Sequence, residues 1–408
     1  MRLLLLAAVL LGSARARAHA HEWVPIGEIS ALGGLHSFDG KSGSFSGNLD
    51  AAFAPAVKLS EAWSLLPSAR AVYEGTRPLN DVLGTATRNQ QRAEGRLGVR
   101  AVYAPVDSRW RIKPGLSYDA ELLKETADEG WGRGLFDARR VAVGGELERL
   151  TDDEHSVRLG AGWFSVAYPN YTTLESRAAL EFPGRGLSRE LAGDRALDRE
   201  GYQFALSADA PLGARAVATA RATGAWSRFA RQHLIDEGGQ FMSETRQDVL
   251  VDFALAARMP HEWNADLRAL GALELGVLTN TSNQNGYDAS RGRFMPGFYD
   301  FFEWRAQPAA TLIVGPPRRP VSASLRLGLK SRRYAHRVPQ GATGAYGAGS
   351  LQTTQWSGGL SLSYPMARRL SLQFSFDRES SSSNTDFQPF YRYSYESTTA
   401  LAGVRWEW

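Results

Sequence analysis

Two short stretches of the sequence combine residue types that could carry acid–base or metal chemistry. His233 stands just before Asp236 and Glu237, and such a trio can act as a general acid and base. Residues 152–155 read Asp-Asp-Glu-His, which are types that coordinate divalent metals. No activated nucleophile stands at a matching spacing, and both stretches have the composition of solvated turns. We therefore expect polar loops at both places, without a catalytic or metal site.

The chain also lacks the common cofactor motifs. It contains no Cys, which excludes zinc–thiolate sites, iron–sulfur clusters and c-type haem attachment. A P-loop, a dinucleotide-binding glycine fingerprint and a Gly-x-Ser-x-Gly turn are likewise missing. The sequence predicts a protein without cofactors that is not an enzyme, with a catalytic loop kept as a minority hypothesis.

Charged residues recur at every second position in several segments, with apolar or small residues between them. Because successive side chains of a strand point to opposite faces, each segment has one charged and one apolar surface. The charged positions predicted to line a hydrated interior are Arg92, Glu94, Arg96, Arg100, Arg111, Lys113, Arg140, Arg158, Asp248, Asp252, Arg268, Glu274, Arg326 and Lys330.

This charged face has two interpretations. Opposite charges can pair across neighbouring strands and keep the interior hydrated and rigid. Alternatively, the arginines can offer guanidinium donors to hydroxyl and carboxylate groups of a passing solute. Both roles can hold together, and the mixture of signs argues against a strongly ion-selective pore.

The connections between these segments are alternately short and long. Seven tight turns lie near positions 60, 106, 152, 212, 261, 316 and 366, and longer polar stretches lie between them, the longest being 169–199. The spacing of about fifty residues corresponds to two strands and two connections. With the terminal segments 23–34 and 395–408, we predict an all-β fold: a closed antiparallel up-and-down transmembrane β-barrel of about 16 strands (14–18), without a plug domain.

The two ends of the chain predict export to the outer membrane of a Gram-negative bacterium. Arg2, the apolar run Leu3–Leu11 and small-x-small sites up to Ala20 indicate a cleaved signal peptide over residues 1–20, leaving 21–408 as the barrel. The last strand ends on Trp408, and a terminal aromatic residue resembles the signal that barrel-assembly machinery recognises, although Phe is usual there. Both termini are predicted to be periplasmic.

Aromatic residues end the apolar faces of several segments. Tyrosine and tryptophan favour the boundary between lipid and water, so they are predicted to form membrane girdles. The residues concerned are Tyr103, Trp110, Trp356, Tyr364, Trp406 and Trp408.

The formal net charge of +4 is weak support for a nucleic-acid partner. Arg2, Arg15 and Arg17 belong to the predicted signal peptide, and their loss leaves the chain nearly neutral. We therefore expect no nucleic-acid partner.

Two stretches carry a resemblance to a protein group. Tyr168–Leu174 reads Tyr-Pro-Asn-Tyr-Thr-Thr-Leu, and Phe376–Asn384 reads Phe-Asp-Arg-Glu-Ser-Ser-Ser-Ser-Asn before Tyr391–Tyr395 in the predicted last hairpin. Both resemble the barrel components of exopolysaccharide and surface-export systems of Gram-negative bacteria. The resemblance implies polysaccharide export through a translocon assembled with periplasmic export proteins.

The leading hypothesis is therefore an outer-membrane conduit, with polysaccharide export preferred. The alternative is a general or solute-selective diffusion porin, for which the loop 169–199 could supply a constriction. A structural or loop-based enzymatic role is the second alternative. Expected partners are outer-membrane lipid, the barrel-assembly machinery, periplasmic export proteins, and a polysaccharide or small polar solute.

Overall fold

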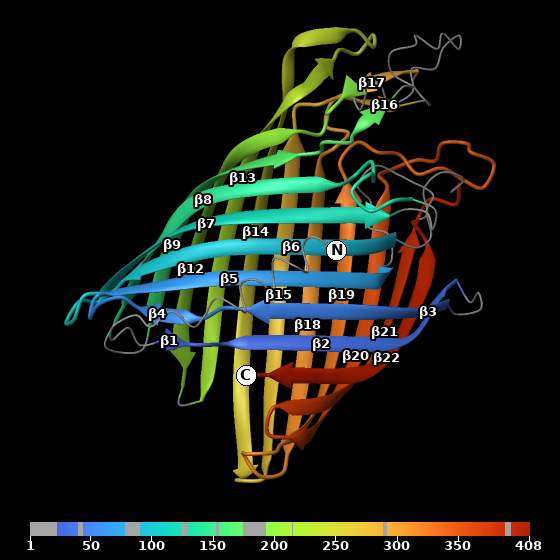
Figure 1. Ribbon diagram of the computed structural model, residues 1–408. Coiled ribbons are helices and arrows are strands. Elements are labelled where there is room, and N and C mark those ends of the chain that lie inside the picture. Colours follow the sequence, from blue (N-terminus) through green and yellow to red (C-terminus); the bar gives the residue numbers. More distant parts are fainter. Residues whose placement is uncertain are drawn as a thin grey trace.

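The computed structural model describes residues 23–39, 44–77, 90–124, 129–151, 155–173, 193–213, 215–288, 292–387 and 393–408. Within them, sixteen long antiparallel strands form one closed sheet, because β22 pairs with β2. This is the predicted up-and-down β-barrel, and the described residues contain no plug domain (Figure 1). The described part of the chain contains no helix that is long and apolar enough to span a membrane. The predicted signal peptide lies outside the described residues.

The strands keep their order in the chain around the barrel. The sixteen barrel strands are β2 (Gly27–Phe38), β3 (Ser44–Phe53), β5 (Trp63–Arg77), β6 (Gln90–Tyr103), β7 (Trp110–Lys124), β8 (Ala138–Leu150), β9 (Ser156–Ala167), β12 (Arg199–Leu212), β13 (Ala216–Ile235), β14 (Phe241–Asn264), β15 (Leu267–Ser282), β18 (Phe301–Val314), β19 (Val321–Tyr334), β20 (Gln352–Ala367), β21 (Leu370–Ser383) and β22 (Tyr395–Glu407). Shorter pieces are β1 (Trp23–Val24), β4 (Ala56–Lys58), β10 (Thr172–Thr173), β11 (Gly193–Asp194), β16 (Gly286–Asp288) and β17 (Arg293–Met295).

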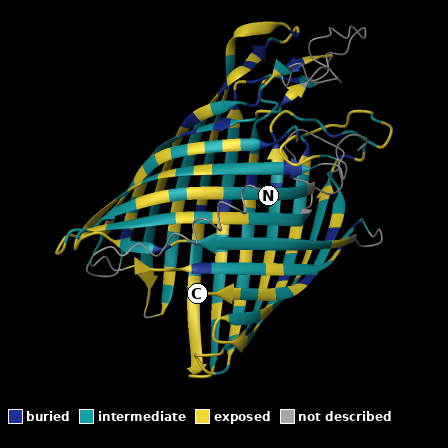
Figure 2. Cartoon of the chain, viewed as in Figure 1, coloured by how far each residue is buried: buried dark blue, intermediate teal, exposed yellow. Residues whose placement is uncertain are grey.

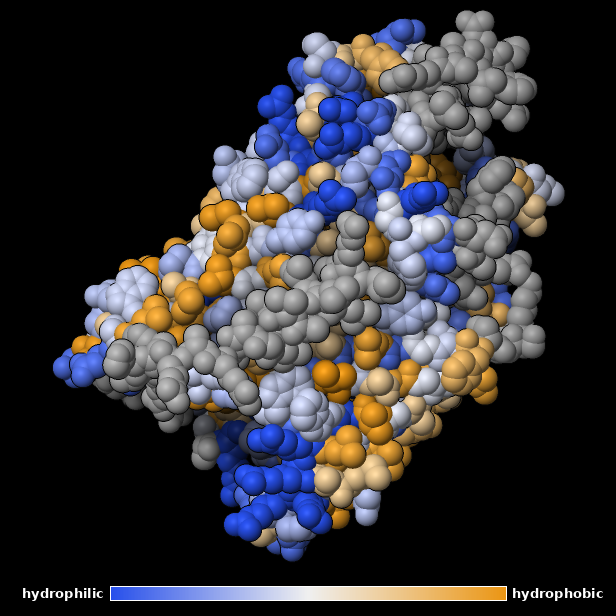
Figure 3. Space-filling view, viewed as in Figure 1, coloured by the Kyte–Doolittle hydropathy of each residue, from blue (hydrophilic) through white to orange (hydrophobic). Residues whose placement is uncertain are grey.

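The wall has two chemically different faces. In β8, exposed residues such as Val141, Val143 and Leu147 alternate with less exposed ones, and the same alternation runs along neighbouring strands (Figure 2). On the side shown in Figure 3, hydrophobic side chains spread across the barrel wall, and hydrophilic ones gather toward its two ends. This outward apolar band is the surface that a lipid bilayer requires of a barrel.

The two ends of the barrel differ in their connections. We call the end with the short connections and both described chain ends the turn end, and the other the loop end. Two predicted turns lie a few residues too early, because β14 continues past Pro260 to Asn264 and β20 continues past Pro365 to Ala367. Proline lacks only an N–H, so a strand tolerates it where the ladder needs no donor. The first barrel strand likewise lies later than the predicted segment 23–34.

Some residues predicted to be loops are strands at the loop end. The polar stretch 231–244 is mostly ordered into the β13–β14 hairpin, whose connection is only Asp236–Gln240. That hairpin rises above the neighbouring strands (Figure 1). Similarly, β21 extends through the serine run to Ser383. Above the membrane both faces of a hairpin meet water, so the ladder continues without the alternation that marks a lipid-facing strand.

The loop end has a small apolar core of its own. It joins the end of β7 to the loops before β8 and before β12, and its buried members are Leu123, Phe136, Tyr171, Ala196 and Leu197. The rings of Phe136 and Tyr171 lie 6.0 Å apart. These two loops are therefore packed together.

A side-chain clamp holds the same two loops. The Asn170 amide nitrogen donates to the carbonyl oxygens of Gly132 (3.0 Å) and Gly134 (3.1 Å) and to the Asp137 carboxylate (3.1 Å). Asp137 also accepts the backbone N–H of Leu123 at 2.9 Å. Burial raises the pKa of the Asp137 carboxyl, against the lowering effect of that N–H. The Tyr-Pro-Asn-Tyr stretch thus fastens one loop to the next.

The seam between β22 and β2 closes the barrel. Arg405 contacts Glu28 across it at 2.7 Å, and the Trp408 N–H donates to the Gly27 carbonyl oxygen at 3.1 Å. Gly403 faces the interior here, and a Cβ at this position would collide with the carbonyl oxygen of Ala31. The strands therefore approach closely because this position has no side chain.

We expect Gly403→Val to prevent closure, because the added side chain cannot be accommodated without moving β2. Overpacking of this kind costs about 1–3 kcal/mol or more. Refolding into detergent followed by cold and heated gel electrophoresis would report it, as loss of the compact, faster-migrating species. The control is Ala402→Val, whose side chain points to lipid. Equal recovery of both variants would contradict a seam that depends on Gly403.

Candidate functional site in the barrel lumen

The strand register places all of the predicted luminal charges on one face of the wall. Arg92, Glu94 and Arg96 alternate with Leu97 and Val99, which are exposed on the outer face. Residues directly opposite one another across neighbouring strands share a face, so the register extends this assignment around the whole barrel. The inward face therefore carries all of these charges, together with polar, small and a few apolar side chains.

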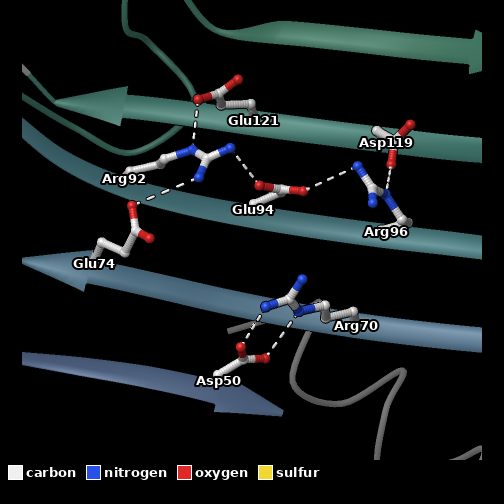
Figure 4. Close-up of polar contacts among 8 residues, drawn as sticks. All are labelled: Asp50, Arg70, Glu74, Arg92, Glu94, Arg96, Asp119 and Glu121. Carbon is white, nitrogen blue, oxygen red and sulfur yellow. Dashed lines mark hydrogen bonds and ion pairs between the residues drawn. The ribbon is translucent and has the colours of Figure 1, made fainter. Parts of the chain in front are cut away.

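A first network spans β5, β6 and β7, with Arg92 at its centre (Figure 4). Its guanidinium donates to Glu121 on β7 at 2.6 Å and lies 3.6 Å from Glu74 on β5. It also bonds Glu94, two residues along its own strand. One arginine thus ties three strands together, since its five N–H donors can serve several carboxylates at once.

The network continues along β6 to Arg96. Arg96 contacts Glu94 at 3.5 Å and bonds Asp119 on β7. Next to it, the Arg70 Nε donates to Asp50 on β3 at 3.0 Å (Figure 4). Five carboxylates stand beside these three arginines, so the guanidinium charges are neutralised and this part of the wall keeps an excess of negative charge.

A second network surrounds Glu148 on β8. Its side chain is only 9% exposed and is approached by three cations, Lys113 at 2.9 Å, Arg158 at 3.3 Å and Arg111 at 3.5 Å. Lys113 also contacts Glu146 at 2.7 Å. Glu148 is therefore the shared counter-charge of neighbouring strands.

A third network lies on the other side of the barrel. Arg305 on β18 contacts Asp252 at 2.9 Å and Glu274 at 3.5 Å, and Glu274 also contacts Arg221 at 3.3 Å. The Arg305 guanidinium lies over Gly276, where a Cβ would stand 2.7 Å from it. The glycine leaves the room in which the arginine lies flat against the wall.

Sequence reasoning missed several members of these networks, among them Arg70, Glu148, Arg221 and Arg305. The signal that could have found them is the same alternation. In β18, for example, the inward residues follow every second position, but the outward Pro308 interrupts the apolar pattern and hides the strand. The pairing partners then follow from the register, not from any spacing along the chain.

Not every luminal cation is neutralised. Arg140 donates to the Gln203 amide oxygen at 2.8 Å and lies over the Phe164 ring. Among the described residues, Arg100, Arg258 and Lys330 have no carboxylate partner. These groups remain available to water or to a solute.

The predicted girdle residues all lie on the outer face, at two levels. Five are near the turn end, where the Trp406 and Trp408 rings lie 4.6 Å apart and Tyr103 lies 4.8 Å from Trp63. Trp356 lies toward the loop end and is 60% exposed. Five of the six predicted residues therefore share one level near the turn end, and a position at the membrane boundary stays a prediction for all six.

The residues that suggested acid–base or metal chemistry have separate partners. The His233 ring contacts the Met242 carbonyl oxygen at 3.1 Å, Asp236 accepts the Gln240 N–H, and Glu237 contacts Arg293. They do not form an acid–base pair. Residues 152–154 lie outside the described part of the chain, and the described residues hold no cluster suited to a metal.

A sheet can cross lipid without unpaired backbone groups only when it is closed, and this one is closed, apolar outside and charged inside. The fold is that of an outer-membrane β-barrel. No protein-family model and no curated protein matches the sequence.

Solved structures of other outer-membrane proteins match over nearly the whole chain, at low identity. A bacterial polysaccharide outer membrane secretin is 9% identical, with a TM-score of 0.44, covering 94% of this chain and 98% of its own. OmpT of Vibrio cholerae in its trimer form is 11% identical, with a TM-score of 0.45 and coverages of 95% and 100%. OpdK of Pseudomonas aeruginosa with vanillate is 12% identical, with a TM-score of 0.45 and coverages of 94% and 98%. The likeness concerns the fold alone.

These comparisons correct the prediction that the chain is not an enzyme. Four of the matching structures are of OmpT, an outer membrane protein, and the shared fold does not separate enzymatic from non-enzymatic barrels. The missing motifs were a wrong basis for excluding catalysis, because groups on barrel loops can meet in space without any fixed spacing along the chain.

Glu148→Gln should destabilise the barrel strongly, because it leaves three neighbouring cations without their shared counter-charge. Removing one partner of a buried ion pair costs about 3 kcal/mol. Urea unfolding of the refolded protein in detergent would measure the change. The matched control is Asp50→Asn, which breaks an exposed pair and should cost about 1 kcal/mol or less. Similar losses in both variants would argue against a special role for Glu148.

Proposed function

We propose that the barrel is a hydrated conduit through which polar solutes cross the outer membrane, with polysaccharide export as its leading role. The observation that carries this proposal is a luminal cavity of about 660 Å³. Its inward-facing lining includes Arg258, Gln307, Arg326, Ser357 and Thr399, which come from five different strands. A cavity lined in this way holds water, and water-filled lumens pass polar solutes.

The charge pairs support a permissive conduit more than a selective ion pore. In each of the networks around Arg92, Glu148 and Arg305, positive and negative side chains are paired within the wall. A pore that selects ions strongly presents rings of one sign to the passing ion. Here a large polar solute would meet fixed dipoles and hydrogen-bonding groups on all sides, with little net field along its path.

In this proposal the turn end faces the periplasm and the loop end faces outside, as short turns and long loops are distributed in such barrels. Residues 1–20 direct export and are removed. The barrel-assembly machinery would recognise the strand that ends at Trp408. Periplasmic export proteins would supply the polymer at the turn end, since nothing in the lumen itself consumes energy.

Polysaccharide export is preferred because the cavity lining is rich in hydroxyl, amide and guanidinium groups, which exchange hydrogen bonds with sugar hydroxyls. The stretches Tyr168–Leu174 and Phe376–Asn384 add the resemblance to export barrels. The alternative is a solute-selective diffusion porin. It is favoured by Arg258 and Lys330, which have no carboxylate partner among the described residues and could attract small anions.

The purified protein is expected to form steady channels in planar bilayers, because its lumen is hydrated. The reversal potential in a salt gradient should show a chloride-to-potassium permeability ratio within a few-fold of unity, since most luminal charges are paired. Barrels refolded with the Gly403→Val seam change are the control and should give few or no channels. Strong selectivity for one ion, or complete absence of conductance, would contradict a permissive open conduit.

Deleting the gene should abolish or greatly reduce surface polysaccharide and leave polymer in the periplasm. Staining of surface polysaccharide and extraction of periplasmic polymer would measure both. A complementing copy should restore export. Unchanged surface polysaccharide, together with slower uptake of small solutes, would reject export and favour the diffusion porin.

A further inference from the structure

The cavity lies on two adjacent rows of inward residues that run across β14, β15 and β18–β22. We call the first the arginine row; its members are Arg258, Ala272, Ala309, Arg326, Gly359, Asp377 and Thr399, each opposite the next in the register. The second is the glutamate row; its members are Ala256, Glu274, Gln307, Gly328, Ser357, Glu379 and Ser397. All fourteen residues line the cavity.

Small residues make the space in the arginine row. Ala272 and Ala309 separate Arg258 from Arg326, so their backbones stand about 14 Å apart at about 4.8 Å per strand. Gly359 lies between Arg326 and Asp377, where a Cβ would stand 2.6 Å from the Asp377 carboxylate. Two guanidinium groups and one carboxylate therefore stand over a floor of alanine and glycine.

These arginines are held far less firmly than the arginines of the neighbouring network around Arg305. Arg326 is 64% exposed and approaches Asp377, itself 52% exposed, only to 3.9 Å. Arg258 has no ion-pair or hydrogen-bond partner among the described residues. By contrast, Arg305 in the neighbouring network reaches Asp252 at 2.9 Å. The two guanidinium groups that face the cavity therefore have donors left to offer to a ligand.

The surrounding groups narrow the class of ligand. A guanidinium fork binds a carboxylate through two parallel hydrogen bonds. Asp377, Gln307 and Ser357 can accept from or donate to hydroxyl groups, and none of the described residues that line the cavity is aromatic and able to stack on an aromatic acid. Glu274 and Glu379 in the second row would repel a second carboxylate within the cavity. A molecule with one carboxylate and several hydroxyls satisfies all of these groups.

We infer that the two rows form a recognition site for carboxylated saccharides, with Arg258 and Arg326 as the carboxylate ligands and Asp377, Gln307 and Ser357 as the hydroxyl partners. The inference rests on the proposed conduit function and names its substrate class. The cavity volume lies within the usual range for ligand sites, about 300–1,000 Å³, which accommodates a sugar acid. The same chemistry occurs in a free sugar acid and in an acidic unit of a polymer.

Interruption of the single-channel current by galacturonate tests this site. The half-blocking concentration should rise at least about tenfold in Arg258→Gln/Arg326→Gln, since each lost charge-assisted hydrogen bond is a substantial share of binding. Arg258→Lys/Arg326→Lys keeps the charge but loses the fork, and should lose most of the block as well. Galactose, which lacks the carboxylate, should block none of the proteins at these concentrations.

The matched control is Arg100→Gln, because Arg100 on β6 is another luminal arginine without a carboxylate partner and lies outside the cavity lining. It should leave the half-blocking concentration unchanged. The inference is overturned if wild type is not blocked, if the double glutamine variant blocks like wild type, or if Arg100→Gln weakens the block equally. Compact migration on cold gels verifies that each variant is folded.

Trigalacturonate distinguishes the source of the carboxylate. Longer blocking events than with the monomer indicate an acidic polymer, and equal events indicate free sugar acids. If wild type carries no current, the conduit proposal fails by itself. Calorimetric titration of galacturonate into the detergent-solubilised protein then tests the site independently, and loss of binding in Arg258→Gln/Arg326→Gln but not in Arg100→Gln would uphold it.

Discussion

The structure depends on the demand that every backbone N–H and C=O group at membrane depth finds a partner within the protein. A sheet meets this demand only when its last strand pairs with its first, and here β22 pairs with β2 from Glu28 to Phe38. Closure gives the wall an inner and an outer face, and side chains alternate between these faces with a period of two. The charged interior, the apolar exterior and the aromatic levels all follow from that period.

The fold was predictable because its signal is repeated in almost every strand. Alternation around Arg92–Arg100 and the rhythm of short turns and long loops gave the closed barrel of about 16 strands. The errors lie near the ends of the strands, where side chains no longer face lipid and the alternation of apolar and polar residues is lost. The sequence predicts turns at Pro260 and Pro365, although β14 and β20 continue past them, and it predicts a loop at the serine run before Asn384, where β21 continues to Ser383. Outside the membrane, composition and backbone pairing are no longer tightly linked.

The luminal site was predictable in its chemistry but not in its organisation. Alternation shows that Arg258, Arg326 and Asp377 are inward candidates once their strands are known, but their common row depends on the register of strands far apart in sequence. The same holds for Glu148, whose three cations come from two other strands. A stretch chosen for its resemblance, Tyr-Pro-Asn-Tyr, contributes a loop clamp at Asn170.

The multi-strand bonding of Arg92 has a consequence for how the barrel is assembled. A slip of one residue between neighbouring strands would turn each charged row toward lipid, at about 2–4 kcal/mol for each arginine near the bilayer midplane. Arg92 contacts carboxylates on β5, β6 and β7. A shift of one of these strands would therefore also leave carboxylates on the other strands without their counter-charge. The luminal ion pairs therefore favour the native register over registers that are shifted by one residue.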